Sequence, residues 1–540
     1  MLKIKETTVP ATTPSHALED NLISRVTLGD TLHRSARKFQ GKIALIEGEQ
    51  RVSYTQLDAD SNRFAYHLLA RGLKPGDKVA MVCGNSIAFM VAAYGILKAG
   101  LVWVPVNIML NVDDVRYAVE HAEARLLILD DQFHAKLLPV ARQLGLPVLV
   151  CETAGGPALP QDELQTLAQA LRDQPVTLPE VIIDDRDLAL IMYTSGTTGR
   201  SKGAMHSHRS VHSALVSNIA AFGNTPSDVF SCFLPLFHCA QFGTAATALL
   251  TGSSVVIQRG FDATAYLDAV HRHRITMMSG LPLMYAAILN HPERARHDLT
   301  SLRLCVYAMA PMPAPMLRRL MAEICPNFSL GSGQTEIWPV TQYFAPDQQL
   351  LRQGNCWGQP CLVNETAIMD DEGNLLGPGQ VGEIVHRGPN IMLGYYKDPE
   401  ATARARRFGW HHTGDLGLWD EDGQLYFKDR MKDMIKTGGE NVPSIKVEEV
   451  LLRHPAVANA AVVGLPHALW SEAVTAFVTL KPGAVCDADA LLAHCREHLA
   501  SFEVPKHITV LDQLPATATG KIQKHVLRGD YRTLFDDSVE

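Results

Sequence analysis

The chain has 540 residues, of which 46% are apolar and 20% charged, a balance typical of a globular protein too long for one hydrophobic core. Its formal net charge is −8 and no long block of Lys and Arg occurs, which disfavours nucleic acid and anionic membrane as partners. Ten cysteines are scattered without metal-binding spacing, so we expect reduced thiols, a cytoplasmic location and no zinc site. We expect neither a signal peptide nor an integral membrane segment, because no long apolar stretch is present.

Helix-like and strand-like patterns alternate through the first part of the chain. We expect helices over residues 31–39, 57–73 and 86–98, and strands over residues 42–46, 79–82 and 102–106. Asp30 is the expected N-cap of the first helix. The alternation continues through residues 114–151 and 209–330, which indicates an α/β fold with mainly parallel sheets flanked by helices.

The pattern changes at Glu365, where short strands and turns predict a small β-rich subdomain that ends before residue 430. The compact segment after Lys432 has a separate pattern of helices and strands. Its expected helices are residues 447–452 and 488–500, and its expected strands are residues 458–464 and 473–480. We therefore expect a large N-terminal domain, residues 1–431, and a small α+β C-terminal domain, residues 432–540.

The most informative motif is YTSGTTGRSKG at residues 193–203, after an apolar run expected to be a buried strand. Three glycines let backbone N–H groups converge on an anion, and Lys202 adds a positive charge. The motif predicts a clamp for a nucleoside triphosphate, although its lysine is not placed as in the P-loop; a polar surface turn is the plainer interpretation. The residues expected to contact phosphate are Thr194, Ser195, Gly196, Thr197, Thr198 and Lys202.

A second motif, GSGQTE at residues 331–336, follows another expected strand. Its glycines permit close approach of a flat ring or an acyl group. Thr335 can bond a phosphate oxygen, and Glu336 is a hard oxygen ligand suited to Mg²⁺. An ordinary junction between a strand and a loop is the alternative.

Three segments near the end of the large domain and beyond it carry further candidates. Asp415, in WHHTGDLG at residues 410–417, can accept hydrogen bonds from both hydroxyls of a ribose. The segment MIKTGGENV at residues 434–442 contains a glycine pair, which alone would be a plain glycine turn. Lys521 lies in a short Gly-Lys loop, which alone would be an exposed turn.

Together these motifs, in this order between residues 74 and 528, closely resemble the acyl-adenylate-forming superfamily, and the GGEN segment resembles its acyl-CoA synthetase branch, the fatty-acid–CoA ligases. The resemblance implies an ATP-dependent ligase that forms acyl-AMP and pyrophosphate, then transfers the acyl group to coenzyme A and releases AMP. ATP, Mg²⁺ and coenzyme A would be required, together with a small carboxylic acid.

The resemblance also implies residue roles. The expected catalytic residues are Lys521, Glu336, Thr198 and His238, with Glu336 and Thr198 as the metal ligands. The expected nucleotide and coenzyme A contacts beyond the phosphate loop are Gly333, Gln334, Thr335, Asp415, Arg430, Lys432, Lys436, Gly438 and Gly439. Lys432 would be the hinge about which the C-terminal domain swings, removing Lys521 and presenting the glycine pair to the thiol.

The residues expected to form the acyl pocket say little about which acid is bound. Its residues would be His238, Met309, Gly331, Gly333 and Trp338, with Gly331 opening space. His238 stands where peptide-synthetase domains place an aspartate, so an α-amino acid is not expected; a core histidine is the alternative reading. We expect a short or medium fatty acid, or a related aliphatic or aryl acid.

Two other functions are compatible with the family. A stand-alone adenylation enzyme could load a carrier protein in trans, but the GGEN segment favours coenzyme A. A catalytically silent relative is disfavoured because Lys202, Glu336, Asp415 and Lys521 are all retained. Whether the chain forms a homodimer is left open.

Overall fold

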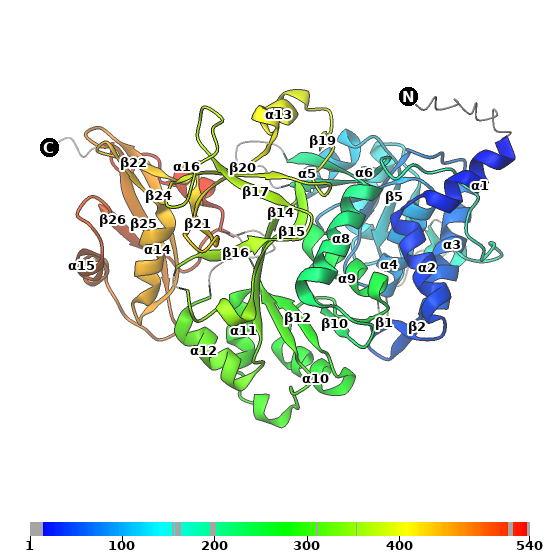
Figure 1. Cartoon of the computed structure of the whole chain (residues 1–540), viewed down its shortest axis with the longest axis horizontal. Helices are drawn as coiled ribbons and strands as arrows, with labels where there is room; N and C mark the ends of the chain where they lie inside the picture. The colour runs from blue at the N-terminus through cyan, green and yellow to red at the C-terminus, as the bar shows by residue number, and fades with distance from the viewer. Residues whose placement is uncertain are drawn as a thin grey trace, which may run out of the picture.

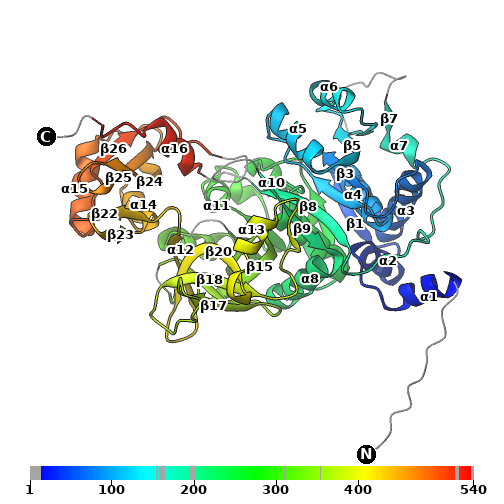
Figure 2. The same cartoon turned by 90° about the horizontal axis from the view of Figure 1, so that it is seen from above.

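The computed structural model describes residues 14–153, 156, 164–194, 201–308, 312–352, 354–516 and 522–536. Within these residues the strands form three sheets of eight, thirteen and five strands. Figures 1 and 2 show the chain running from the two larger sheets to the smallest one, near the C-terminus. None of the described helices has the length and apolar character needed to cross a membrane.

The eight-stranded sheet carries the segment that leads into the predicted phosphate loop. Its strands, in spatial order, are β19 (Gly394–Tyr395), β9 (Lys202–Ser207), β8 (Leu188–Thr194), β4 (Val102–Pro105), β3 (Lys78–Val82), β5 (Ala124–Asp130), β6 (Val148–Cys151) and β7 (Gln165–Thr166). The strands from β8 to β7 are parallel, whereas β9 and β19 are antiparallel additions at one edge.

The thirteen-stranded sheet is parallel in its middle and antiparallel elsewhere. In spatial order it comprises β17 (Glu365–Met369), β18 (Gly382–Arg387), β20 (His411–Trp419), β21 (Leu425–Arg430), β16 (Cys356–Pro360), β15 (Ile337–Phe344), β14 (Phe328–Gln334), β13 (Leu304–Tyr307), β12 (Met277–Gly280), β10 (Val229–Cys232), β11 (Ser254–Ile257), β1 (Ile43–Glu47) and β2 (Gln50–Ser53). The expected β-rich region is therefore present, as an extension of this sheet.

Successive side chains of a strand point to opposite faces of the sheet, so each sheet has two faces to bury. Helices cover the faces of both sheets. The helices of this part are α1 (Pro14–Ser24), α2 (Leu28–Phe39), α3 (Tyr54–Ala70), α4 (Ile87–Lys98), α5 (Val112–His121), α6 (His134–Gln143), α7 (Leu167–Ala170), α8 (His208–Phe222), α9 (Cys239–Thr251), α10 (Ala263–His273), α11 (Pro282–Leu289), α12 (Ala314–Glu323) and α13 (Pro399–Arg404). One apolar core joins α2, α3, α4, α8 and α9 to both sheets, from Leu190 of β8 to Phe230 of β10. Neighbouring residues Met277 and Met278 face opposite sides: Met277 belongs to this core, and Met278 packs with α10 to α12.

The C-terminal unit is a five-stranded sheet with helices on both faces. Its elements are β22 (Ile435–Thr437), β23 (Glu440–Val442), β24 (Val457–His467), β25 (Ser471–Leu480), β26 (His507–Val510), α14 (Ser444–Arg453), α15 (Ala488–His498) and α16 (Lys524–Asp530). Because β21 ends at Arg430 and β22 begins at Ile435, the change of sheet falls at the expected boundary. The division at residues 431 and 432 stays a prediction.

The expected fold class, α/β with a small C-terminal domain, is confirmed, but the expected first N-cap is wrong. Helix α2 begins at Leu28, and the side chain of Thr27 caps it by accepting a hydrogen bond from the Asp30 backbone N–H at 3.2 Å. Asp30 instead lies in the first turn, where its carboxylate pairs with Arg25 at 2.8 Å. Because the Asp30 carboxylate pairs with Arg25, the Thr27 hydroxyl is the group that caps the helix.

Candidate active site

Strands β8 and β9 form a hairpin that holds the two ends of the predicted phosphate loop together. Thr194 and Lys202 are direct partners across this hairpin. The loop residues Ser195, Gly196, Thr197 and Thr198 lie outside the described residues, so their predicted roles stay predictions. The apolar strand expected before the loop is present, because Ala189, Leu190 and Ile191 of β8 are fully buried.

Tyr395 connects the phosphate-loop lysine to the predicted metal ligand. Its hydroxyl donates a hydrogen bond to Glu336 Oε1 at 2.9 Å, and the Lys202 Nζ atom lies 5.0 Å from the centroid of its ring. Burial raises the pKa of the Tyr395 phenol, so the hydroxyl keeps its proton and acts as the donor. Two motifs that are far apart in the sequence therefore meet at this ring.

Thr335 is fixed through its backbone and lies beside the start of α9. The ring of His206 donates from Nε2 to the Thr335 carbonyl oxygen at 2.7 Å, and burial lowers the pKa of His206 to about 4. This histidine is therefore neutral. The Thr335 hydroxyl lies 3.6 Å from Cys239 Sγ, at the first residue of α9.

His238 is the N-cap of α9. Its Nδ1 atom accepts a hydrogen bond from the Ala240 backbone N–H at 3.2 Å, so Nδ1 carries no proton in this arrangement. His238 is partly exposed, and its cap bond gives the ring a structural task. Its predicted role as a pocket gate stays a prediction.

The predicted ribose site is assembled from three strands. Asp415 and Arg430 are partners across β20 and β21, with Arg430 Nε 3.1 Å from Asp415 Oδ1. Gln334, at the end of β14, donates from Nε2 to Asp415 Oδ2 at 2.7 Å and to the Thr413 carbonyl oxygen at 3.0 Å. The GSGQTE and TGD motifs therefore form one site, in which the Asp415 side chain is only 4% exposed.

Glu383 of β18 holds the turn that presents Asp415, and the sequence analysis gave it no role. One of its carboxylate oxygens accepts the Gly414 backbone N–H at 2.8 Å, and the other lies 2.7 Å from His412 Nδ1. Gly414 has φ +72°, a left-handed conformation that favours glycine. The Gly-Glu pair of β18 was visible in the sequence, but its partners were not.

The predicted acyl residues lie in closely packed surroundings. Trp338 is fully buried, with its ring 5.3 Å from that of His206 and 6.4 Å from that of Phe242. Gly331 is expected to open space, but a Cβ atom there would be 3.3 Å from Val340 and 3.4 Å from Val306. The glycine thus permits tight packing of two valines, and the expected opening is not found there.

Gly333 and Met309, which are also predicted to line the acyl pocket, give no further information about its shape. A Cβ atom on Gly333 would lie 2.8 Å from Pro339, so close packing also explains this glycine. Met309 lies outside the described residues. The assignment of these residues to an acyl pocket stays a prediction.

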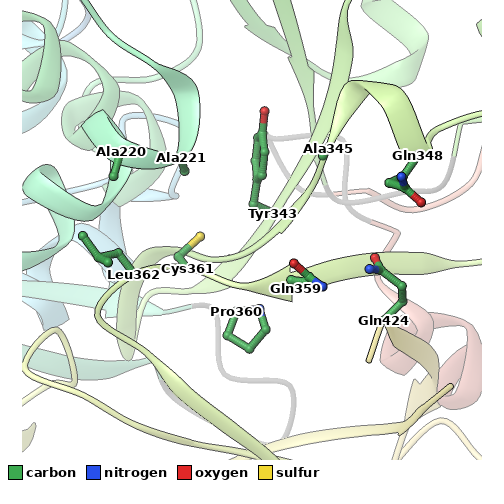
Figure 3. A pocket seen from close by; sticks show the side chains of 10 residues that line it. All are labelled: Ala220, Ala221, Tyr343, Ala345, Gln348, Gln359, Pro360, Cys361, Leu362 and Gln424. Atoms are coloured by element: carbon green, nitrogen blue, oxygen red, sulfur yellow. The ribbon is translucent and has the colours of Figure 1, made fainter. Parts of the chain in front are cut away.

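A separate hollow of about 290 Å³ lies between the end of α8 and strands β15 and β16 (Figure 3). Its lining residues are Ala220, Ala221, Tyr343, Ala345, Gln348, Gln359, Pro360, Cys361, Leu362 and Gln424. Tyr343 is the strand partner of Gly331, so the hollow adjoins the sheet of the predicted acyl residues. None of the predicted site residues lines it.

The predicted coenzyme A residues lie on the C-terminal sheet. Gly438 and Gly439 form the turn between β22 and β23 with φ +58° and +88°, and the Gly438 N–H donates to the Trp470 carbonyl oxygen at 2.9 Å. Lys436 is exposed on β22, and Lys432 follows β21. Both views show β22 at the end of the molecule that holds the C-terminus, on the opposite side from β5 of the eight-stranded sheet. Lys521 lies outside the described residues.

Known proteins resemble the chain over nearly its whole length. The family described as AMP-binding enzyme matches residues 32–396, and the AMP-binding enzyme C-terminal domain matches residues 446–521. Feruloyl-CoA synthase from an Amycolatopsis species is 36% identical over 511 residues, which are 94% of this chain and 99% of that protein.

Two solved structures have the same overall fold. ATP-bound MatB from Rhodopseudomonas palustris is 30% identical with a TM-score of 0.85, and the match covers 94% of this chain and 99% of MatB. The anthranilate CoA ligase AuaEII in complex with anthranoyl-AMP is 28% identical with a TM-score of 0.85, covering 95% of this chain and 99% of AuaEII. The MatB structure contains ATP, and the AuaEII structure contains anthranoyl-AMP, an acyl adenylate.

Proposed function

This chain belongs to the AMP-binding enzyme family, among its acid–thiol ligases, and we propose that it joins a small carboxylic acid to coenzyme A through an acyl-AMP intermediate. The observation that carries the proposal is the convergence of Gln334, Asp415 and Arg430 at one end of a site and of Lys202, Tyr395 and Glu336 at the other. The first group suits a ribose and the second a triphosphate. A ribonucleoside triphosphate carries both a ribose and a triphosphate, and the ATP-bound relative MatB supports ATP as the nucleotide.

In the first half reaction, a carboxylate oxygen of the acid attacks the α-phosphorus of ATP, and pyrophosphate leaves. Two anions must meet, so the residues act mainly by positioning the reactants and neutralising charge. Lys202 supplies a cation beside the phosphate loop, and Asp415 holds the ribose. We assign Lys521 to the charge that develops at the reacting phosphate.

Mg²⁺ would be held by Glu336 and Thr198, and when bound it supplies positive charge to the phosphate oxygens. The Glu336 carboxylate fits this role because it is partly exposed and Tyr395 occupies only one of its oxygens. Among the described residues, no cluster of three His, Cys, Asp or Glu side chains is arranged to hold a metal. Mg²⁺ is usually bound by one or two carboxylates together with substrate phosphates, so phosphate oxygens would supply further ligands.

In the second half reaction, the thiol of coenzyme A attacks the acyl carbon and AMP leaves. We propose that the C-terminal domain turns about Lys432 between the two steps, which withdraws Lys521 and brings the Gly438–Gly439 turn to the nucleotide. Lys432 lies in the short link between β21, which ends at Arg430, and β22, which begins at Ile435, and this position supports such a movement.

We propose a short or medium fatty acid, or a related aliphatic or aryl acid, as the substrate. His238 supplies no permanent anion for an amino group, so α-amino acids are excluded from the proposal. Feruloyl-CoA synthase and the anthranilate CoA ligase are named for aryl acids, which supports including that class. We also propose a cytoplasmic location, which the ten free cysteines support.

The test is a panel of acids with purified enzyme, ATP and Mg²⁺, assayed for pyrophosphate and for AMP with and without coenzyme A. We expect acid-dependent pyrophosphate release and a thioester product with coenzyme A. If a carrier protein stimulates AMP release and coenzyme A does not, the enzyme loads a carrier protein instead. Turnover of a free α-amino acid at a comparable rate would contradict the role given to His238.

A further inference from the structure

Tyr395 contacts two oppositely charged groups that the proposed reaction uses. Its hydroxyl donates to Glu336 Oε1 at 2.9 Å, and its ring faces Lys202 Nζ at 5.0 Å from the centroid. Within the described part of the chain, no ion pair joins Lys202 directly to Glu336. One neutral side chain thus contacts both a cation and an anion of the proposed site.

The backbone around Tyr395 is fixed from both sides. Strand β19 pairs with β9, so that Tyr395 faces Ala204, and the Tyr395 N–H donates to Thr402 Oγ1 at 2.8 Å. The Met392 N–H donates to the Glu336 carbonyl oxygen at 2.8 Å, which ties the same segment to the GSGQTE motif. The phenol therefore reaches Glu336 from a rigid position.

We propose that Tyr395 is a positioning residue for the metal-bound triphosphate: its hydroxyl orients the Glu336 carboxylate toward the metal, and its ring holds the Lys202 ammonium beside the phosphate loop. The proposal rests on the proposed function for the identity of the nucleotide and the metal. Because the hydroxyl occupies one carboxylate oxygen, Glu336 keeps its second oxygen for Mg²⁺. If Tyr395 had a structural role alone, its hydroxyl would only need to give the Glu336 carboxylate a hydrogen-bond partner.

The chain offers a matched control in the next residue. The hydroxyl of Tyr396 donates to Glu123 Oε2 at 2.6 Å, a carboxylate that is largely exposed. Tyr396→Phe therefore removes the same group, also bound to a carboxylate, from the same strand end. Tyr395→Phe removes the hydroxyl but keeps the ring above Lys202, and Tyr395→Leu removes both.

The experiment measures ATP binding by calorimetry with and without Mg²⁺, and the Mg²⁺ concentration that gives half-maximal pyrophosphate release. For Tyr395→Phe we expect about a tenfold higher Mg²⁺ requirement and a smaller strengthening of ATP binding by Mg²⁺, with metal-free ATP binding unchanged. Tyr395→Leu should also weaken metal-free ATP binding, because Lys202 loses its support. Tyr396→Phe should match the wild type in every measurement.

An unchanged Mg²⁺ dependence in Tyr395→Phe would overturn the inference, as would an equal change in Tyr396→Phe. The binding measurement needs no acid and no turnover. If the wild type releases no pyrophosphate with any acid, the proposed function fails while the calorimetry still decides the role of Tyr395. Thioester formation from supplied acyl-AMP and coenzyme A should be unaffected in Tyr395→Phe, and its loss would indicate a general structural defect and contradict the proposal.

Discussion

Asp415 is a buried carboxylate whose two oxygens are both engaged in the structure. Arg430 supplies the opposite charge at 3.1 Å, and the amide of Gln334 donates at 2.7 Å. Taking a carboxylate out of water is costly unless it is paired and hydrogen-bonded, and both conditions are met here. If ribose hydroxyls replaced the Gln334 amide as hydrogen-bond donors, the Asp415 carboxylate would therefore already be oriented to accept them.

Asp415→Ala should weaken ATP binding on the order of 100-fold, because two hydrogen bonds from ribose hydroxyls to a charged acceptor are lost. Calorimetry with ATP and with 2′,3′-dideoxy-ATP measures this directly. The variant should bind both nucleotides equally weakly, whereas the wild type should prefer ATP. Asp420→Ala is the control, since it removes the same side chain from another Asp–Arg ion pair, with Arg352 at 2.8 Å, outside the site. If Asp415→Ala keeps the preference for ATP, Asp415 does not bind the ribose.

The sequence predicted the charged site residues better than the residues that position them. Asp415, Arg430 and Glu336 lie in motifs of unusual composition, so their chemistry could be read directly. Tyr395 and Glu383 lie in ordinary strand segments, and their roles come from contacts with residues 59 and 31 positions away in the chain. Such contacts depend on how β19 meets β9 and how β18 meets β20, which local patterns do not specify.

At the scale of elements, the turn between β22 and β23 is the part of the C-terminal sheet with the clearest predicted task. Both of its glycines have positive φ, and a Cβ atom on Gly439 would meet nothing within 4 Å. The turn is therefore open to a passing group. A large side chain there would extend into the space that the proposed pantetheine path needs.

Gly439→Leu should block thioester formation while acyl-AMP still forms, and Lys521→Ala should do the reverse. The two half reactions are followed separately, as pyrophosphate release from acid and ATP and as thioester formation from supplied acyl-AMP. Gly483→Leu is the control for backbone strain, because Gly483 has φ +77° in another open turn of the same domain. If folded Lys521→Ala impairs both half reactions equally, the proposed domain movement is wrong.

Most elements of the core could be predicted because their apolar residues follow regular spacings. The helix expected over residues 86–98 corresponds to α4 (Ile87–Lys98), and the strand expected over residues 473–480 lies within β25 (Ser471–Leu480). The N-cap of α2 was misassigned because Thr27 and Asp30 are both good cap residues by type, and the contacts of Asp30 with Arg25 and Thr27 are not visible in the sequence. The packing of valines against Gly331 was equally invisible, since Val306 and Val340 come from different strands.

At the scale of the whole molecule, buried histidines link stability to pH. Burial lowers the pKa of His206 to about 4 and of His386 and His411 to about 3, so all three are neutral in the folded protein. In the unfolded chain a histidine titrates near 6.5. The unfolded state therefore binds more protons below that pH, and the stability present above pH 6.5 is lost as the pH falls toward the folded values.

The free energy of unfolding should fall by roughly 2 kcal/mol per buried histidine between pH 7 and pH 5. His411→Leu should reduce this pH dependence, since both ring nitrogens of His411 lack hydrogen-bond partners and leucine has a similar volume. Denaturant unfolding at both pH values gives the comparison, with His498→Gln as the exposed control. The same pH dependence in His411→Leu and in the wild type would contradict the assignment.

The central claim is that the site activates a carboxylic acid by forming acyl-AMP, and one measurement tests it directly. One acid that the enzyme converts in the panel is labelled with ¹⁸O at both carboxylate oxygens. It is converted with ATP, Mg²⁺ and coenzyme A, and the masses of the products are measured by mass spectrometry. We predict that one ¹⁸O atom appears in AMP, because the carboxylate oxygen that attacks the α-phosphorus stays with AMP when the thiol displaces it. Label in orthophosphate, or thioester formation with unlabelled AMP, would contradict the account.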